Sequence, residues 1–240
     1  MGQSWSNFQQ RKNAKSLLEL APTATPGRTA PLPNLTRPTL TQALANVGDY
    51  LLKKKKNVTV IAVGGAVNTI FLQSRTSTHD VDFYNSRLTV AEYGYLMSAA
   101  KDAAGKDPQL NEGWFNNHTV FFIPQAQRDA LTNQAFTQNE VIFQHGGLKV
   151  LAAPWDYAFC CKIDRLAGGG VNAAQSYDLS DAVGYLHRYL TKRSLATIPL
   201  ATVKQWFTAY SLRWTANNDE VIKRLNAAYK AKYKVEKVIV

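Results

Sequence analysis

The apolar residues of this chain follow helical and strand-like spacings in turn. From Leu40 to Leu51 a leucine or valine recurs every three or four residues, which predicts an amphipathic helix. Residues 57–63 form a short, continuous apolar run, as expected for a buried strand. Residues 66–72 return to helical spacing, and residues 81–84 (Val-Asp-Phe-Tyr) favour a strand. This part of the chain is therefore predicted to run helix, strand, helix, strand.

The alternation continues to about residue 153. A helix is predicted at 89–101, where Thr89 and Glu92 have the spacing of a capping box. A hairpin is predicted where Gly146-Gly147 separates two apolar runs. The other elements expected here are strands around 119–123, 140–144 and 148–151, and a short helix within 124–133.

Beyond residue 153 only helical spacing remains, and it predicts helices at 154–167, 177–193, 199–213 and 218–233. A mixed segment followed by helices alone indicates an α+β fold, with a mixed β-sheet core and a C-terminal helical bundle. We therefore divide the chain into a tail at 1–38, a core at 39–153 and a helical region at 154–240.

The first 38 residues differ from the rest in composition. Proline recurs among Ser, Thr, Gln and Asn from Pro22 to Pro38. Such a segment has too few apolar residues to build a core, so it is predicted to be a flexible tail.

The tail begins with a pattern that fits N-myristoylation, Met-Gly-Gln-Ser-Trp-Ser, in which Gly2 would be the acceptor. Arg11, Lys12 and Lys15 would add electrostatic attraction to an anionic membrane. Acylation of Gly2 with peripheral membrane contact is one expectation. An unmodified Gly2 is the alternative, because the pattern is loose and Met-Gly starts are common.

Composition narrows the class of protein. Lys and Arg total 28 against 17 Asp and Glu, a net charge of +11, and such an excess attracts polyanions including RNA and free nucleotides. We find no apolar run of the ~18 residues that would predict a transmembrane helix. The two cysteines, Cys160 and Cys161, are adjacent and have no zinc-site spacing, so we expect an intracellular, cytoplasmic protein.

Two aspartates carry the strongest chemical signal. Asp80 and Asp82 stand one residue apart at a predicted strand, so both carboxylates should project from the same face. Paired carboxylates are oxygen ligands of the kind that Mg²⁺ and Mn²⁺ prefer. His79 would point to the opposite face and is not expected to be a ligand.

The pair follows a turn suited to phosphate. Gly64-Gly65 lies between the strand at 57–63 and the helix at 66–72. Glycine lets the backbone approach a ligand closely, and backbone N–H groups at a helix start can bind phosphate oxygens. The order strand, Gly-Gly, helix, Asp-x-Asp strand therefore predicts a site for a metal ion and a triphosphate.

Ala62-Val63-Gly64-Gly65 followed by Asp80-Val81-Asp82-Phe83 resembles the motif of the nucleotidyltransferase superfamily of the polymerase-β type. The similarity is greatest to its small stand-alone branches, which are toxin-like or uncharacterised. It extends over roughly residues 40–190, through a downstream helix bearing Lys162 and Arg165 and a helix that opens with Asp178 and Asp181.

The resemblance implies a nucleotidyltransferase-like core and a transferase activity. A nucleoside monophosphate would pass from an NTP to a hydroxyl of a protein, an RNA or a small molecule. Asp80 and Asp82 would be catalytic and would hold Mg²⁺ or Mn²⁺. The substrate-binding residues would be Gly64, Gly65, Arg75, Lys162 and Arg165.

The chain departs from the family at the third carboxylate. The strand that should carry it, at 118–123, has no acidic residue, and Glu140 is the nearest substitute as a base or outer ligand. A degenerate protein that binds nucleotide or nucleic acid on the same fold is therefore the alternative hypothesis. A basic structural protein that coats nucleic acid through its tail is a third.

Overall fold

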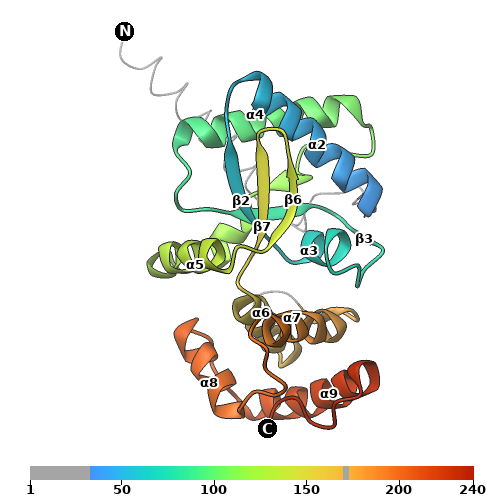
Figure 1. Ribbon diagram of the computed structural model, residues 1–240, viewed down its shortest axis with the longest axis vertical. Coiled ribbons are helices and arrows are strands. Elements are labelled where there is room, and N and C mark those ends of the chain that lie inside the picture. The colour runs from blue at the N-terminus through green and yellow to red at the C-terminus, as the bar shows by residue number, and fades with distance from the viewer. Residues whose placement is uncertain (1–32, 170–172) are drawn as a thin grey trace.

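The computed structural model describes residues 33–169 and 173–240, and it shows an α+β fold around a mixed five-stranded sheet (Figure 1). The strand order is β5-β4-β2-β7-β6. Most of the predicted tail, including Gly2, lies outside the described residues. Residues 33–38 are part of the folded protein, because Leu35 is fully buried and a short strand, β1 (Leu35–Thr36), pairs with β3 (Ser77–Thr78).

The central strand of the sheet is the apolar run expected at 57–63. It forms β2 (Val58–Val63), in which Val60, Ile61 and Ala62 are fully buried. It pairs antiparallel with β4 (Val81–Tyr84) and parallel with β7 (Leu148–Ala152). The outer strands are β6 (Val141–His145), antiparallel to β7, and β5 (Phe115–Asn116), parallel to β4.

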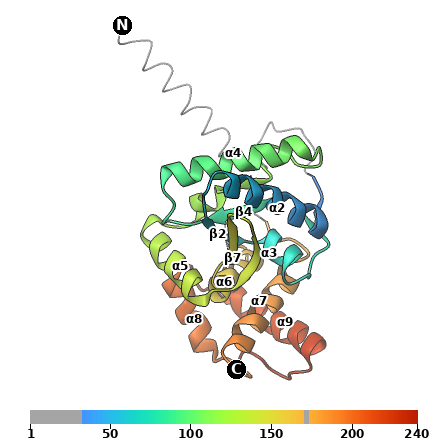
Figure 2. The same ribbon diagram turned by 45° about the horizontal axis from the view of Figure 1, so that its top comes forward.

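Two long helices pack on each other, and one of them packs on the sheet (Figures 1 and 2). They are α2 (Arg37–Lys53), which contacts β6 and β7, and α4 (Val90–Lys106). The predicted capping box of α4 is confirmed: the Glu92 N–H donates to the Thr89 hydroxyl at 3.2 Å, and the Thr89 N–H donates to the Glu92 carboxylate at 2.8 Å. The predicted hairpin is also present, since Gly146 and Gly147 join β6 and β7.

The strand expected at 119–123 is wrong. Residues His118–Phe122 form a 3-10 helix, and the sheet strand β5 lies just before it. The Asn116 side chain accepts the His118 N–H at 2.9 Å, which ends β5 after two residues. Arg128 then donates to the carbonyls of Val120 and Ile123, so this backbone finds partners outside the sheet.

The C-terminal part, which follows β7, is helical, as predicted. The helices α6 and α7 pack on each other, and they contact α8 and α9 respectively. Figure 1 shows these four beyond the end of the sheet. The helices not yet named are α3 (Gly65–Ile70), α5 (Gln125–Gln138), α6 (Trp155–Leu166), α7 (Asp178–Lys192), α8 (Leu200–Ala209) and α9 (Ala216–Tyr233).

Within residues 33–169 and 173–240, no helix combines the length and the apolar character needed to span a lipid bilayer.

Candidate functional site

The register of the sheet brings the two motifs together. In the antiparallel pair of β2 and β4, Val63 lies opposite Asp82, so Gly64 follows directly beside the aspartate strand. On the other side of β4, Asp82 lies opposite Asn116 of β5. The predicted closeness of the glycine turn and the aspartate pair is therefore a property of the fold.

The two glycines serve different needs. Gly64 has φ +66, a conformation that L side chains rarely adopt, and a Cβ there would meet no atom within 4 Å. At Gly65 a Cβ would lie 2.8 Å from the Thr78 Cβ, too close for a side chain. The open side of the turn is thus at Gly64, where a ligand can approach the backbone closely.

The turn is anchored from the helical region. The Gly64 carbonyl accepts the Asn68 side-chain amide at 3.0 Å and the Tyr185 hydroxyl at 3.3 Å. Tyr185 belongs to α7, so the contact fixes α7 relative to β2. Since α3 has only six residues, its helix dipole is small, and the feature of the turn that bears on ligand binding is the open backbone at Gly64.

Ionisation of the aspartate pair is costly in the metal-free protein. Asp82 lies on β4 and Asp80 directly precedes it, and both side chains are half-buried. Burial, together with the charge of Asp80, raises the pKa of Asp82 to about 8. Burial also raises the pKa of Asp80, although a hydrogen bond from Asn116 opposes the shift. A bound cation would relieve this repulsion.

Asn116, the partner of Asp82 on the neighbouring strand β5, interacts with the aspartate pair. Its side-chain amide donates to Asp80 at 3.4 Å and to the Gly113 carbonyl at 3.1 Å. Its oxygen is engaged by the His118 N–H. The residue therefore presents N–H groups, not an oxygen ligand, toward the aspartates.

The donor set fits one hard cation. Mg²⁺ is commonly held by one or two carboxylates together with substrate phosphates, and Asp80 and Asp82 supply those carboxylates. Among the described residues no group of three or more His, Cys, Asp or Glu side chains is arranged to hold a metal ion. A second ion held by protein carboxylates is therefore not supported by these residues.

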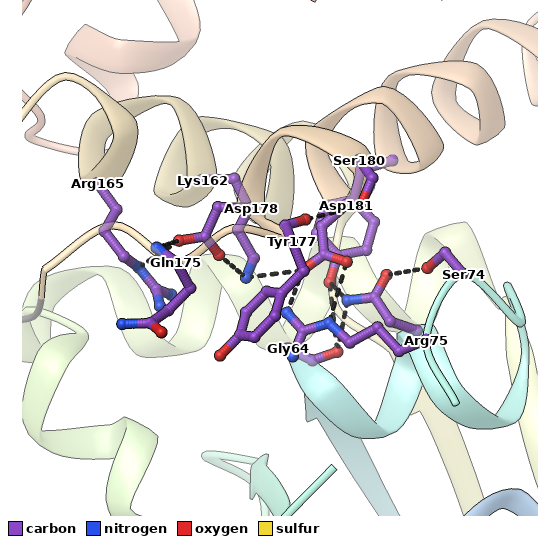
Figure 3. A network of polar contacts seen from close by, with 12 residues as sticks. Gly64, Ser74, Arg75, Lys162, Arg165, Gln175, Tyr177, Asp178, Ser180 and Asp181 are labelled. Atoms are coloured by element: carbon purple, nitrogen blue, oxygen red, sulfur yellow. Dashed lines mark hydrogen bonds and ion pairs between the residues drawn. The ribbon is translucent and has the colours of Figure 1, made fainter. Parts of the chain in front are cut away.

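The predicted basic residues meet the predicted acids of α7 in one buried network (Figure 3). Lys162 contacts Asp178 at 2.6 Å and Asp181 at 2.9 Å, and all three are almost fully buried. Arg75 forms an ion pair with Asp181, in which its Nε donates at 3.1 Å. The network joins the loop before β3 to both α6 and α7.

The pairing changes the expected role of these cations. Burial disfavours the charge on Arg75, but the hydrogen bond and charge of Asp181 outweigh it and raise the pKa of Arg75. Burial likewise disfavours the Asp178 carboxylate, but its hydrogen bond from Lys162 holds the pKa of Asp178 low. Lys162 is thus neutralised by protein carboxylates. Arg165, 3.7 Å from Asp178 and 29% exposed, is the more accessible cation.

The structure does not bring Glu140 to the aspartate pair. Its carboxylate binds Arg188 at 2.9 Å, Lys192 at 3.5 Å and the Trp155 indole N–H at 3.3 Å. These contacts join the start of β6 to α6 and α7, so Glu140 stabilises the packing of these elements.

Sequence reasoning missed four residues that shape the site. Asn116 was hidden by the misplaced strand, and no motif marked Asn68, Tyr177 or Tyr185. The Tyr177 ring lies over the Arg75 guanidinium, with 3.5 Å between the guanidinium carbon and the ring centroid.

Comparison with known families places the chain. A family model described as "Domain of unknown function (DUF7582)" matches residues 33–236. The chain belongs to this family. The match covers the sheet and all of α6, α7, α8 and α9, so the two parts form one family unit. No match was found among curated proteins or among solved structures.

Proposed function

We propose that this protein is a metal-dependent nucleotidyltransferase that binds an NTP beside Asp80 and Asp82. The observation that carries the proposal is the register of β2 and β4, in which Val63 faces Asp82. It puts an open, positive-φ glycine next to a pair of carboxylates that favour a cation. This is the arrangement that a metal–triphosphate complex requires.

Different residues would bind the metal, bind the phosphates and hold the helices in place. Asp80 and Asp82 would hold Mg²⁺ or Mn²⁺, which supplies charge neutralisation on the phosphates when bound. Gly64 would let the triphosphate lie against the backbone. Arg165 would offer its accessible guanidinium to phosphate oxygens, whereas Lys162 and Arg75 would hold α6, α7 and the turn in place through their aspartates.

The transfer itself is a displacement at the α-phosphorus. The oxygen of an acceptor hydroxyl forms a bond to that phosphorus, the bond to the bridging oxygen breaks, and pyrophosphate leaves. The hydroxyl proton passes to water. The acceptor would belong to a protein, an RNA or a small molecule, and the net charge of +11 favours polyanionic partners.

Asn116 favours a second candidate function, which is nucleotide binding without transfer. Two-metal catalysis uses carboxylates to clamp both the attacking and the leaving oxygen. With an amide opposite Asp82, the site would hold one metal ion and a triphosphate but would lack a carboxylate for a second ion. A sensor or a nucleotide-regulated binding protein would need no more.

Transfer of label from NTPs separates these functions. The full chain is incubated with each α-labelled NTP and Mg²⁺ or Mn²⁺, with total RNA and total protein as acceptors. The Asp80→Asn/Asp82→Asn variant is the test, and Asp102→Asn is the matched control, because Asp102 is a partly exposed aspartate of α4 that pairs with Lys106. Label transfer lost only in the double variant supports the transferase.

Other outcomes decide against it. Metal-dependent NTP binding without transfer, lost in the double variant, supports the second candidate. Transfer or binding that is unchanged by the double variant would refute the assignment of Asp80 and Asp82. Any acylation of Gly2, and with it a membrane location, is a separate proposal that mass spectrometry of the native N-terminus decides.

A further inference from the structure

The aromatic ring of Tyr177 is an accessible surface next to the candidate site. The residue is 37% exposed and directly precedes α7, whereas most aromatic rings of the described chain are packed in the core. One face of the ring is covered by the Arg75 guanidinium at 3.5 Å. The ring therefore packs on Arg75 with one face, and another part of it is exposed to solvent.

The support under the ring is rigid. Arg75 is fastened through two nitrogens to Asp181, and Asp181 is itself bound by Lys162. Only 11% of the Arg75 side chain is exposed, and Asp181 is fully buried. A ring held over such an anchored guanidinium is set in position before any ligand arrives, so little conformational entropy is lost on binding.

The ring also has the right location. An Arg75 terminal nitrogen lies 3.5 Å from where a Cβ on Gly65 would be, so the guanidinium extends from the ring to the glycine turn. Figure 3 shows the Tyr177 ring projecting away from α7 on the same side as Gly64. A ligand with its phosphates at Gly64 would therefore have a flat aromatic surface beside it.

The charges around the ring favour an uncharged, flat group. Lys162 lies 5.5 Å from the ring centroid, but its ammonium group is satisfied by Asp178 and Asp181. Arg75 is likewise paired. With both cations neutralised, this surface offers stacking rather than phosphate binding. Nucleobases stack on aromatic side chains whatever their sequence identity.

We propose that Tyr177 is the stacking platform for the base of the bound nucleotide, with Arg75 as the residue that positions it. This inference rests on the proposed nucleotide site and names the part of the ligand that the aspartates and glycines do not contact. It predicts that the base contributes to affinity through Tyr177 and that purines, with the larger rings, bind more tightly than pyrimidines.

A comparison of two ligands tests the stacking directly. Isothermal titration of the full chain with Mg²⁺ measures binding of an NTP analogue with a non-hydrolysable α,β bridge and of inorganic tripolyphosphate, which has no base. Tyr177→Ala is expected to weaken the NTP analogue by roughly 5- to 150-fold, the equivalent of the stacking energy of one base, and to leave tripolyphosphate unchanged. Tyr177→Phe keeps the ring and should bind the analogue more tightly than Tyr177→Ala.

The control is Phe121→Ala, which removes an exposed aromatic ring from the 3-10 helix and should affect neither ligand. If Tyr177→Ala binds both ligands as the wild type does, the stacking role is overturned while the phosphate site stands. An equal loss of both ligands would mean that Tyr177 only supports the fold, and Tyr177→Leu checks this by keeping side-chain bulk. If the wild-type chain binds neither ligand, the proposed function fails with it.

Discussion

Asn116 donates a hydrogen bond of 3.4 Å to Asp80, and it is the cross-strand partner of Asp82. The amide thus interacts with one aspartate through its side chain and lies in register with the other. An amide N–H can stabilise two crowded carboxylates where no cation is bound, which a third carboxylate would not do. The identity of residue 116 should therefore control how strongly the site depends on metal.

Replacing Asn116 with Asp is expected to increase the dependence of stability on bound metal. Three carboxylates would repel one another, so Asn116→Asp should melt at a lower temperature than the wild type in EDTA. An added charged ligand should strengthen Mn²⁺ binding by roughly tenfold, since affinity follows ligand charge count. Metal would then restore the melting temperature, because a ligand that binds only the native state stabilises it.

Asn133→Asp is the matched control, since Asn133 is exposed on α5 and contacts Arg87 instead. Titration calorimetry gives the Mn²⁺ affinity, and thermal unfolding with and without Mn²⁺ gives the stability. Equal Mn²⁺ affinity in Asn116→Asp and the wild type would show that residue 116 does not face the metal.

The raised pKa of Asp82 predicts how stability changes with pH. In the metal-free native chain Asp82 keeps its proton up to a pH of about 8, whereas in the unfolded chain it is lost near pH 4. Between these values the native state binds more protons, so the free energy of unfolding falls as pH rises. Asp82→Asn cannot ionise and should lack this decline.

Thermal unfolding in EDTA at several values between pH 5 and pH 8 measures the effect. The melting temperature of the wild type should fall relative to Asp82→Asn across this range, by about 2–4 °C for each kcal/mol lost. Mg²⁺ binding should strengthen over the same range because the ligands must be deprotonated. A difference between the two chains that stays constant with pH would contradict a raised pKa.

Much of this fold follows from local sequence patterns, and the exceptions have physical causes. The apolar run of β2 and the capping box of α4 each specify their element within a few residues, so both were predictable. Val120 and Phe121 favour strands intrinsically, but Arg128, from a helix further along the chain, binds the backbone of their segment instead. Contacts of that kind leave no trace in a local pattern.

The candidate site divides in the same way. Gly64 and Gly65 could be placed near Asp80 and Asp82 because the glycines follow β2 and the aspartates stand at the start of β4, which pairs with it. The pairing of Lys162 with Asp178 and Asp181 could not be predicted, because the resemblance assigned Lys162 to the substrate and no local pattern shows which charges it contacts. Whether a lysine is free for phosphate or neutralised by carboxylates depends on the packing of α6 against α7, which spacing does not encode.

The buried ion network should be sensitive to the loss of one charge. Asp181→Asn leaves Arg75 without its partner and removes one of two carboxylates from Lys162. Breaking a buried ion pair by removing one member costs about 3–5 kcal/mol, because an uncompensated charge stays buried. Urea unfolding should show a loss of this size.

The comparison is Glu220→Gln, which breaks the ion pair with Lys223 on the surface of α9. Exposed pairs are worth about 0–1 kcal/mol, so this variant should be nearly as stable as the wild type. Similar losses in the two variants would mean that the Arg75–Asp181–Lys162 network contributes no more than a surface pair.

The two glycine environments give the last prediction. Gly65→Ala would place a Cβ 2.8 Å from the Thr78 Cβ, and it would push the start of α3 away from β3. Such a shift moves the Gly64 turn relative to the aspartates, so NTP binding should weaken more than stability falls.

Gly94→Ala is the control: a Cβ there meets no atom within 4 Å, and the residue lies within α4. Alanine is favoured over glycine in a helix by about 0.5–1 kcal/mol, so Gly94→Ala should raise the melting temperature and leave NTP binding unchanged. Calorimetric titration with an NTP and Mg²⁺, beside thermal unfolding, measures both effects. Wild-type NTP affinity in Gly65→Ala would show that the turn does not contact the nucleotide.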